Sequence, residues 1–272
     1  MSDPDRTVSG DTDTWMLFER TTSDGFPLVV LARTGNSLVD EMLRSGFVTV
    51  VECQPDPSII NDRGMPQHTD RIYPAEDEMA EFLAGTGALH IASVTGDGLR
   101  RVFYAHTDPI DFPTIVGRFV VQEYTLQAGR AENVADWIPI ISPTEIDRQL
   151  NGDRGVITQL ENAGDTLTTP RKVDFWAYGD RPSLTDFARE LGSWDFEVDH
   201  WLDGEDGLVL TRELALNLDT FREVTPVLVE TADRHGVTYD GWETIVVIYS
   251  EPIVETSSSL LSKLFGGKKI NG

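Results

Sequence analysis

Between residues 172 and 248 the hydrophobic pattern changes repeatedly between the period of a β-strand and the period of an α-helix. This alternation limits the possible folds more than any other feature of the sequence. Apolar side chains at every second position predict strands, and apolar side chains three or four positions apart predict helices. The pattern predicts strands at 172–178, 196–200, 208–214 and 241–248, and helices at 183–192 and about 221–236.

Local signals mark the ends of the two helices. Ser183 and Asp186 form a predicted capping box, and Gly192 ends the helix that they begin. In the second helix Pro226 leaves two alternatives: the helix bends there, or Thr225 caps a helix that begins at Pro226. The resulting order, β-α-β-β-α-β, is that of the ferredoxin-like sandwich, in which a four-stranded antiparallel sheet carries both helices on one face.

The last of these strands begins within a Tyr-Asp-Gly-Trp sequence at 239–242. Gly241 favours a positive φ or a bulge, Asp240 can accept hydrogen bonds from nearby backbone amides, and Trp242 can pack against a helix. The β-branched residues that follow predict a buried strand up to residue 248. We favour this structural role, although an aromatic side chain beside a carboxylate could also contact a partner.

The first half of the chain also mixes strands and helices, and two hairpins are its clearest elements. Their turns are Thr-Thr-Ser-Asp-Gly at 21–25 and Thr-Gly-Asp-Gly at 95–98. Ser142 and Glu145 form a predicted capping box for a helix that ends near Leu150. The other predicted elements are strands at 47–53 and 119–126 and helices at 36–46 and near 76–84, with a long loop at 54–74.

We therefore predict an α+β protein of two tandem domains, at 14–152 and 154–250, with a flexible tail at 251–272. Turn formers at 162–170 support a boundary in this part of the chain. The tail places three of the four lysines among apolar residues. Such a segment could fold on a partner, touch an anionic membrane or fold back on the acidic body.

Acidic residues outnumber basic residues by 46 to 22, which gives a formal net charge of -24. Phosphate backbones and anionic membranes repel such a chain, so we expect no direct nucleic acid binding and predict a protein partner with a basic segment. No apolar stretch has the length of a membrane span, and no signal peptide is visible. The single cysteine, Cys53, excludes an intrachain disulfide. These features favour a cytoplasmic location.

No catalytic site, metal site or cofactor is predicted. The five histidines are scattered, without a pair at the helical spacing of metal ligands. The predicted partner-binding side chains are acidic or aromatic, and a solvated surface is the alternative for each acid. They are Asp195, Glu197 and Asp199 on one strand face, Glu223, Glu230 and Asp233 on the second helix, and Tyr239, Asp240 and Trp242 at the last strand.

Four groups of residues in the second half carry a resemblance to a known family. They are Leu160-Glu-Asn-Ala-Gly-Asp165, Pro170-Arg-Lys-Val173, Ala215-Leu-Asn217 and Tyr239-Asp-Gly-Trp242. Over about residues 154–248 the chain resembles the regulator of ribonuclease activity B (RraB) family. The resemblance implies a small acidic inhibitor that binds the regulatory region of the endoribonuclease RNase E and catalyses no reaction.

Other groups lie in the first half: Thr14-Trp15 with Asp24-Gly25, Gly64-Met65-Pro66, residues 95–104, and Asp136-Trp137 followed by Ser142-Pro143. Through them, residues 14–150 resemble a bacterial domain-of-unknown-function family that often precedes an RraB-like domain. This resemblance implies no chemistry. One alternative is therefore a small-ligand-binding module or an enzyme in the N-terminal domain, with His68 and Asp70 of the long loop over a pocket. Another alternative is an immunity or scaffolding protein.

Overall fold

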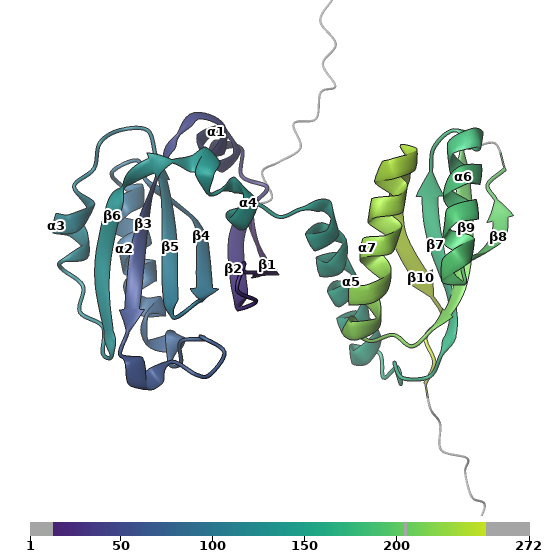
Figure 1. Cartoon of the computed structure of the whole chain (residues 1–272), viewed down its shortest axis with the longest axis horizontal. Coiled ribbons are helices and arrows are strands. Elements are labelled where there is room, and N and C mark those ends of the chain that lie inside the picture. Colours follow the sequence, from purple (N-terminus) through teal and green to yellow (C-terminus); the bar gives the residue numbers. More distant parts are fainter. Residues whose placement is uncertain (1–12, 204–205, 249–272) are drawn as a thin grey trace, which may run out of the picture.

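The computed structural model describes residues 13–203 and 206–248 and contains two antiparallel β-sheets with helices packed against them (Figure 1). The prediction that the chain mixes helices and strands is confirmed. Strands between residues 14 and 133 form a six-stranded sheet, and strands between residues 171 and 244 form a four-stranded sheet. The tail predicted at 251–272 lies outside the described residues.

The first sheet contains β1 (Thr14–Thr21), β2 (Pro27–Thr34), β3 (Phe47–Pro55), β4 (Leu89–Gly96), β5 (Leu99–His106) and β6 (Tyr124–Asn133). Their order is β1-β2-β4-β5-β3-β6, and every neighbouring pair is antiparallel. Both predicted hairpins are confirmed, as β1-β2 and β4-β5. Asp97 and Gly98, in the second turn, have positive φ angles of 52° and 72°, which suit the twist of a tight hairpin.

Alternation along the strands divides the side chains of this sheet between two hydrophobic cores. On one face, Leu28 and Val30 of β2 pack with residues of α1 (Ser37–Ser45), α4 (Ile138–Ile141) and the short 3-10 helix η3 (Val134–Asp136). On the other face, side chains of β3 and β5 pack with α2 (Tyr73–Ala84) and α3 (Phe112–Val116). These two helices leave β1 uncovered, so Trp15 and Leu17 remain 43% and 44% exposed.

Two predictions in the first half are corrected by the structure. The strand expected at 119–126 forms later, as β6, and Val120 is 95% exposed. Glu123, with a φ of 65°, lies at the reversal before β6, and pairing with β3 then defines the strand although most of its side chains are exposed. The loop expected at 54–74 contains two 3-10 helices and the start of α2: η1 (Pro57–Ile59), η2 (Thr69–Arg71) and Tyr73.

The helix predicted to end near Leu150 is longer than expected. It is α5 (Glu145–Asn162), and Thr144 and Asp147 form its capping box instead of Ser142 and Glu145. The Thr144 side chain accepts a hydrogen bond from the backbone of Asp147, and the Asp147 carboxylate accepts one from the backbone of Thr144. The helix runs without a break through residues 152–154, where we placed the boundary between two domains, so that division stays a prediction.

The second sheet follows in the predicted order β-α-β-β-α-β. Its elements are β7 (Arg171–Tyr178), α6 (Arg181–Leu191) with the short η4 (Gly192–Trp194), β8 (Glu197–Trp201), β9 (Gly207–Leu214), α7 (Leu218–His235) and β10 (Thr238–Thr244). The strands form an antiparallel sheet of order β10-β7-β9-β8. Residues of α5, α6 and α7 share one core with this sheet, and α5 lies beside α7 (Figure 1).

The helix ends in this region differ from the sequence signals. Asp180 caps α6 through a hydrogen bond from the backbone of Ser183, so Ser183 is not the cap that we predicted. Asn217 caps α7, which continues through Pro226. The alternative in which Thr225 begins a helix is therefore wrong. Its hydroxyl donates a hydrogen bond to the Asp153 carboxylate of α5 at 2.7 Å instead.

The last strand, β10, begins and ends earlier in the chain than the strand predicted at 241–248. The Tyr-Asp-Gly-Trp sequence lies inside β10, and the register shifts between Tyr239 and Gly241. Gly241 has a φ of 99°, so the predicted bulge is confirmed. The strand ends at residue 244, and Ile245 and Ile248 are 72% and 65% exposed instead of buried.

The strand predicted at 196–200 is an edge strand with irregular pairing. We expected Phe196 and Val198 to face the core together. Phe196 is buried, but Val198 is 45% exposed because β8 has a neighbour on only one side. A register shift between Val198 and His200 also interrupts the alternation of side chains around Asp199.

Candidate functional site

A groove with a volume of about 440 Å³ lies between the N-terminus of α5, the C-terminal half of α7 and the start of β10. We call it the acidic groove. Apolar side chains and carboxylates both line it. Its lining residues are Thr144, Glu145, Ile146 and Gln149 of α5 and its cap, Val229, Glu230, Ala232 and Asp233 of α7, and Val237, Thr238 and Tyr239.

The charges of the acidic groove all have one sign. Glu145, Glu230 and Asp233 contribute carboxylates, and no lysine, arginine or histidine lines the groove. Glu145 forms an exposed ion pair with Arg148 at 3.2 Å, which is weak because water screens both groups. Glu230 and Asp233 form no ion pair with any residue in the described part of the chain. The groove therefore favours a cationic ligand.

Backbone groups also border the acidic groove. β10 is at one edge of its sheet and pairs only with β7 among the described strands. An unpaired strand edge can pair with an extended peptide. From α5, the Gln149 amide donates to the Tyr239 carbonyl at 3.5 Å, which is a long hydrogen bond.

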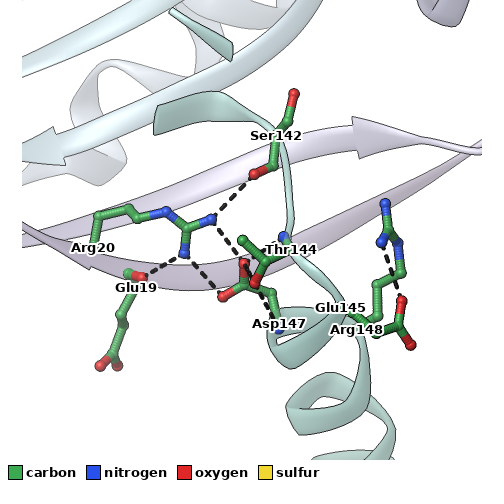
Figure 2. Close-up of polar contacts among 7 residues, drawn as sticks. All are labelled: Glu19, Arg20, Ser142, Thr144, Glu145, Asp147 and Arg148. Atoms are coloured by element: carbon green, nitrogen blue, oxygen red, sulfur yellow. Dashed lines mark hydrogen bonds and ion pairs between the residues drawn. The ribbon is translucent and has the colours of Figure 1, made fainter. Parts of the chain in front are cut away.

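The α5 wall of the acidic groove is held in place by the first sheet. Figure 2 shows Arg20 of β1 reaching the start of α5, where its guanidinium donates to both carboxylate oxygens of Asp147 at 2.9 Å and 2.7 Å. The same guanidinium donates to the Ser142 carbonyl at 3.1 Å. This arginine therefore binds the capping box and the segment before it, and so orients Glu145 and Gln149 in the groove.

Asp147 is charged in this position. Burial alone would raise the pKa of its carboxyl, but hydrogen bonds from Arg20 and Thr144 outweigh burial and hold the pKa below its ordinary value. A second contact between the two halves is more exposed: Arg222 of α7 pairs with Glu19 of β1 at 3.0 Å. The β1 strand is thus joined to both helices that form the walls of the groove.

Beneath the acidic groove, α5, α7 and β10 meet at a buried carboxylate. Asp153 is 2% exposed and accepts hydrogen bonds from the Trp242 indole and the Thr225 hydroxyl, both at 2.7 Å. Burial raises the pKa of Asp153 to about 6, and the two hydrogen bonds offset only part of that rise. The Trp242 ring stacks on Phe221 with a centroid distance of 4.5 Å.

Residues 151–244 match the family model for RraB, described as regulator of ribonuclease activity B.

The RraB match covers about one third of the chain and includes every strand of the second sheet. It confirms the predicted resemblance of the second half and indicates a regulator of ribonuclease activity. The match begins inside α5, so the resemblance of the first half to a domain of unknown function stays a prediction. A search of the curated proteins found no match to this chain.

The RraB-matching region brings together only some of the predicted partner-binding residues. Glu230, Asp233 and Tyr239 line the acidic groove, although the Tyr239 side chain is buried. Asp240 is exposed at the bulge in β10, and Glu223 is exposed on α7 outside the groove. Trp242 is also predicted, but it lies in the core, where it binds Asp153.

The three predicted acids before and within β8 lie outside the acidic groove. Asp195, Glu197 and Asp199 are all exposed. They do not form an alternating row, because Asp195 ends η4 with a φ of 61° and Asp199 lies at the register shift. Lys172 and His200 each contact the Asp199 carboxylate at 2.7 Å, so this acid is paired within the RraB-matching region.

Sequence reasoning missed Glu145 and Gln149 as groove residues. Both lie before the RraB match, in a helix that we expected to end near Leu150 and did not connect with α7. The available signal was the Thr144 and Asp147 capping box, which has the same spacing as the box that we chose. A helix predicted to continue from this box past Leu150 would have connected Glu145 and Gln149 with the second half of the chain.

No group of three or more His, Cys, Asp or Glu side chains in the described residues could hold a metal ion. No helix in this part of the chain is long and apolar enough to cross a membrane. Met65, Pro66 and Thr69 of the long loop line a pocket, but His68, which pairs with Glu123, and Asp70 do not, so the placement of these two residues over a pocket is wrong. The ligand-binding alternative itself stays a prediction.

Replacing Tyr239 with phenylalanine should leave the free energy of unfolding within about 0.5 kcal/mol of its original value, or raise it slightly. The hydroxyl of Tyr239 is buried and has no hydrogen-bond partner among the described residues, so its removal should leave the ring packed and abolish an unpaired polar group. Urea unfolding followed by circular dichroism measures the change. A loss above about 1.5 kcal/mol would mean that the hydroxyl has a partner in solution.

Proposed function

We propose that this protein is a non-catalytic regulator that binds a basic segment of a protein partner in the acidic groove. The observation that carries the proposal is a groove with three carboxylates, no basic lining residue and an open strand edge beside it. Positive side chains of the partner would approach Glu145, Glu230 and Asp233, and its backbone could pair along β10. Binding of this kind requires no catalytic group.

The RraB match supports a ribonuclease as the regulated enzyme. We infer that the partner is a protein of an RNA-degrading assembly, and the resemblance implies RNase E as the target. The element order and the β10-β7-β9-β8 sheet support a ferredoxin-like domain for this part of the chain. We propose that the first sheet forms a second domain that orients the α5 wall through Arg20.

Charge reversal at the groove should abolish binding of the basic segment. In the double variant Glu230→Lys with Asp233→Lys, two attractive charges become repulsive, so we expect affinity for a lysine-rich and arginine-rich peptide of the ribonuclease to fall at least about 100-fold. Isothermal titration calorimetry at about 0.1 M salt measures this affinity, and an RNA cleavage assay measures loss of inhibition. Binding to the original protein should weaken as salt rises toward 1 M and the Debye length shortens to about 3 Å.

Glu223→Lys is the matched control for this experiment. It reverses one charge on the same helix, α7, but outside the acidic groove. The control should reduce affinity about tenfold at most, through the general field of the protein. If Glu223→Lys weakens binding as much as the double variant does, overall acidity and not the groove recognises the partner. Inhibition that persists in the double variant would contradict the proposed site.

A further inference from the structure

Besides the acidic groove, the structure has a concave site at the first sheet, far in sequence from the RraB match. A pocket of about 570 Å³ opens where α2 and α3 leave one face of β1 and β2 uncovered. Its floor consists of four apolar side chains that alternate with the core residues of their strands. They are Trp15 and Leu17 of β1 and Val29 and Leu31 of β2. A volume of this size suits a small organic molecule.

A buried polar wall faces this apolar floor. Arg100 of β5 donates to both carboxylate oxygens of Glu76 on α2, at 2.5 Å and 2.7 Å, and to the Thr95 hydroxyl at 2.6 Å. Arg100 and Glu76 are only 7% and 5% exposed. Each of the three nitrogens of Arg100 thus already has a partner, and its charge is balanced by Glu76. The arginine therefore adds no net positive charge that would attract an anion to the pocket.

The imidazole at the end of the floor carries no charge either. His90 hydrogen-bonds the Ser93 hydroxyl through Nε2 at 3.0 Å and contacts the Trp15 ring with a centroid distance of 4.8 Å. Burial, with the nearby Arg100 charge, lowers the pKa of His90 to about 4, so the ring is neutral at pH 7. The pocket gains no positive charge from this residue.

The free charge of the pocket is negative. Asp77 of α2 lines the pocket, is exposed and forms no ion pair with the described residues. With Glu76 and Arg100 balanced, the lining has a net charge of -1. Tyr73, also on α2, is 45% exposed and is a second aromatic residue of the pocket lining, and the Arg100 guanidinium lies 5.2 Å from the centroid of its ring. Aromatic faces and a carboxylate together favour a cation that carries an apolar group.

We propose that this pocket binds a small aromatic amine, with the ring on the floor formed by Trp15, Leu17, Val29 and Leu31 and the ammonium group toward Asp77. The site is separate from the acidic groove and does not depend on the proposed regulatory function. Anions should bind poorly, because Asp77 repels them and Glu76 balances the charge of Arg100. A neutral ring compound should bind more weakly than the amine, since it gains only the apolar contact.

Three small probes with the same ring test the proposal on the full chain: 2-phenylethylamine, 2-phenylethanol and 3-phenylpropionate. Binding is followed by NMR from the indole N–H signals of the six tryptophans, with the Trp15 signal assigned by its loss in Trp15→Phe. The amine should shift the Trp15 signal and bind about tenfold more tightly than the alcohol, and the acid should not bind. No shift at Trp15 with the amine, or equal affinity for the amine and the acid, would overturn the proposal.

Variants distinguish the contribution of the Asp77 charge to binding from that of the apolar floor. Asp77→Asn should reduce affinity for the amine about tenfold and leave affinity for the alcohol unchanged. Leu17→Ser should weaken binding of both, and its exposed position keeps the fold intact. Glu78→Gln is the control, because it removes the same charge from α2 at a residue outside this pocket. If the control weakens amine binding as much as Asp77→Asn does, the assignment of the ammonium group to Asp77 is wrong.

Discussion

Replacing Arg171 with alanine should lower the free energy of unfolding of the RraB-matching region by about 3–5 kcal/mol. Arg171 begins β7 and pairs with Asp165 at 2.5 Å, and the two side chains are 5% and 0% exposed. The guanidinium also donates to the Ile245 carbonyl at 3.1 Å. Alanine would leave the Asp165 carboxylate buried without its partner, which is the costly way to break a buried ion pair.

The same pair ties the chain after β10 to the loop before β7. The Asp165 carboxylate accepts hydrogen bonds from the backbone of Leu167 and Val247, at 2.7 Å and 2.6 Å. Loss of Arg171 should therefore also release residues 245–248 from the loop. Unfolding in guanidinium chloride measures the free energy of unfolding, and faster hydrogen exchange of the Val247 amide would report the local release.

A matched control removes an arginine from an exposed pair. Arg189 pairs with Asp186 one helical turn away on α6, and both are well exposed. Arg189→Ala should cost no more than about 0.5 kcal/mol. If Arg171→Ala also cost less than about 1 kcal/mol, the buried pair would contribute far less than its geometry implies.

The pH dependence of this pair has a definite sign. Hydrogen bonds from Arg171 and from backbone amides outweigh burial and hold the pKa of Asp165 well below its ordinary value of 3.8. Its folded pKa is thus lower than its unfolded pKa, so the pair stabilises the fold above about pH 4 and this stabilisation is lost as the pH falls through the folded pKa. Asp165→Asn should remove this contribution and flatten the acid limb of the stability curve.

Asp153 should produce the opposite pH dependence. Its folded pKa of about 6 is higher than the ordinary value of 3.8 that applies to the unfolded chain. The protonated carboxyl therefore favours the folded state, fully below about pH 4, and this stabilisation is lost as the pH rises through 6. A difference of about two pKa units corresponds to roughly 3 kcal/mol between pH 4 and pH 7.

Asp153→Asn should remove this loss of stability. The amide oxygen can accept from the Trp242 indole, and the amide nitrogen can donate to the Thr225 hydroxyl, so both present partners keep a hydrogen bond. We expect the asparagine variant to be at least as stable as the original protein at pH 7. The difference in free energy of unfolding between the two proteins, measured in urea from pH 4 to pH 7, isolates Asp153 from the other carboxylates.

Asp153→Ala separates charge from hydrogen bonding. It removes the buried charge but leaves the Trp242 N–H and the Thr225 hydroxyl without their acceptor, which should cost about 2–4 kcal/mol relative to Asp153→Asn. Equal pH profiles for the original protein and Asp153→Asn would contradict the raised pKa. Equal stability of the alanine and asparagine variants would contradict the two hydrogen bonds.

Local patterns predicted the elements whose stability depends on nearby residues. The two hairpins of the first sheet were predicted because turns that end in Asp-Gly separate apolar runs, and Asp97 and Gly98 adopt the positive φ angles of a tight hairpin turn. The β-α-β-β-α-β order of the second half was predicted because each element has its own period. The bulge at Gly241 was predicted because few other residues accept a φ of 99°.

Other elements could not be placed without their partners. β6 is mostly exposed and owes its position to pairing with β3, so its hydrophobic pattern misled the prediction of 119–126. The apolar residues from Ile245 to Ile248 read as a buried strand, but the chain is bound there by Asp165 and Arg171 and leaves the sheet. Pro226 lies inside α7, because packing between α7 and its neighbours outweighs the cost of one missing hydrogen bond.

The sequence alone determined the order of strands and helices in the second half, the excess of acid and the resemblance to RraB, because these depend on composition and short-range pattern. Only the tertiary structure decided which acidic side chains are available to contact a partner. It paired Asp199 with Lys172, buried Asp153 against Trp242 and left Glu230 and Asp233 without an ion pair in the described part of the chain. Such differences arise from contacts between segments far apart in the chain, and identical carboxylates acquire different surroundings only when those segments pack together.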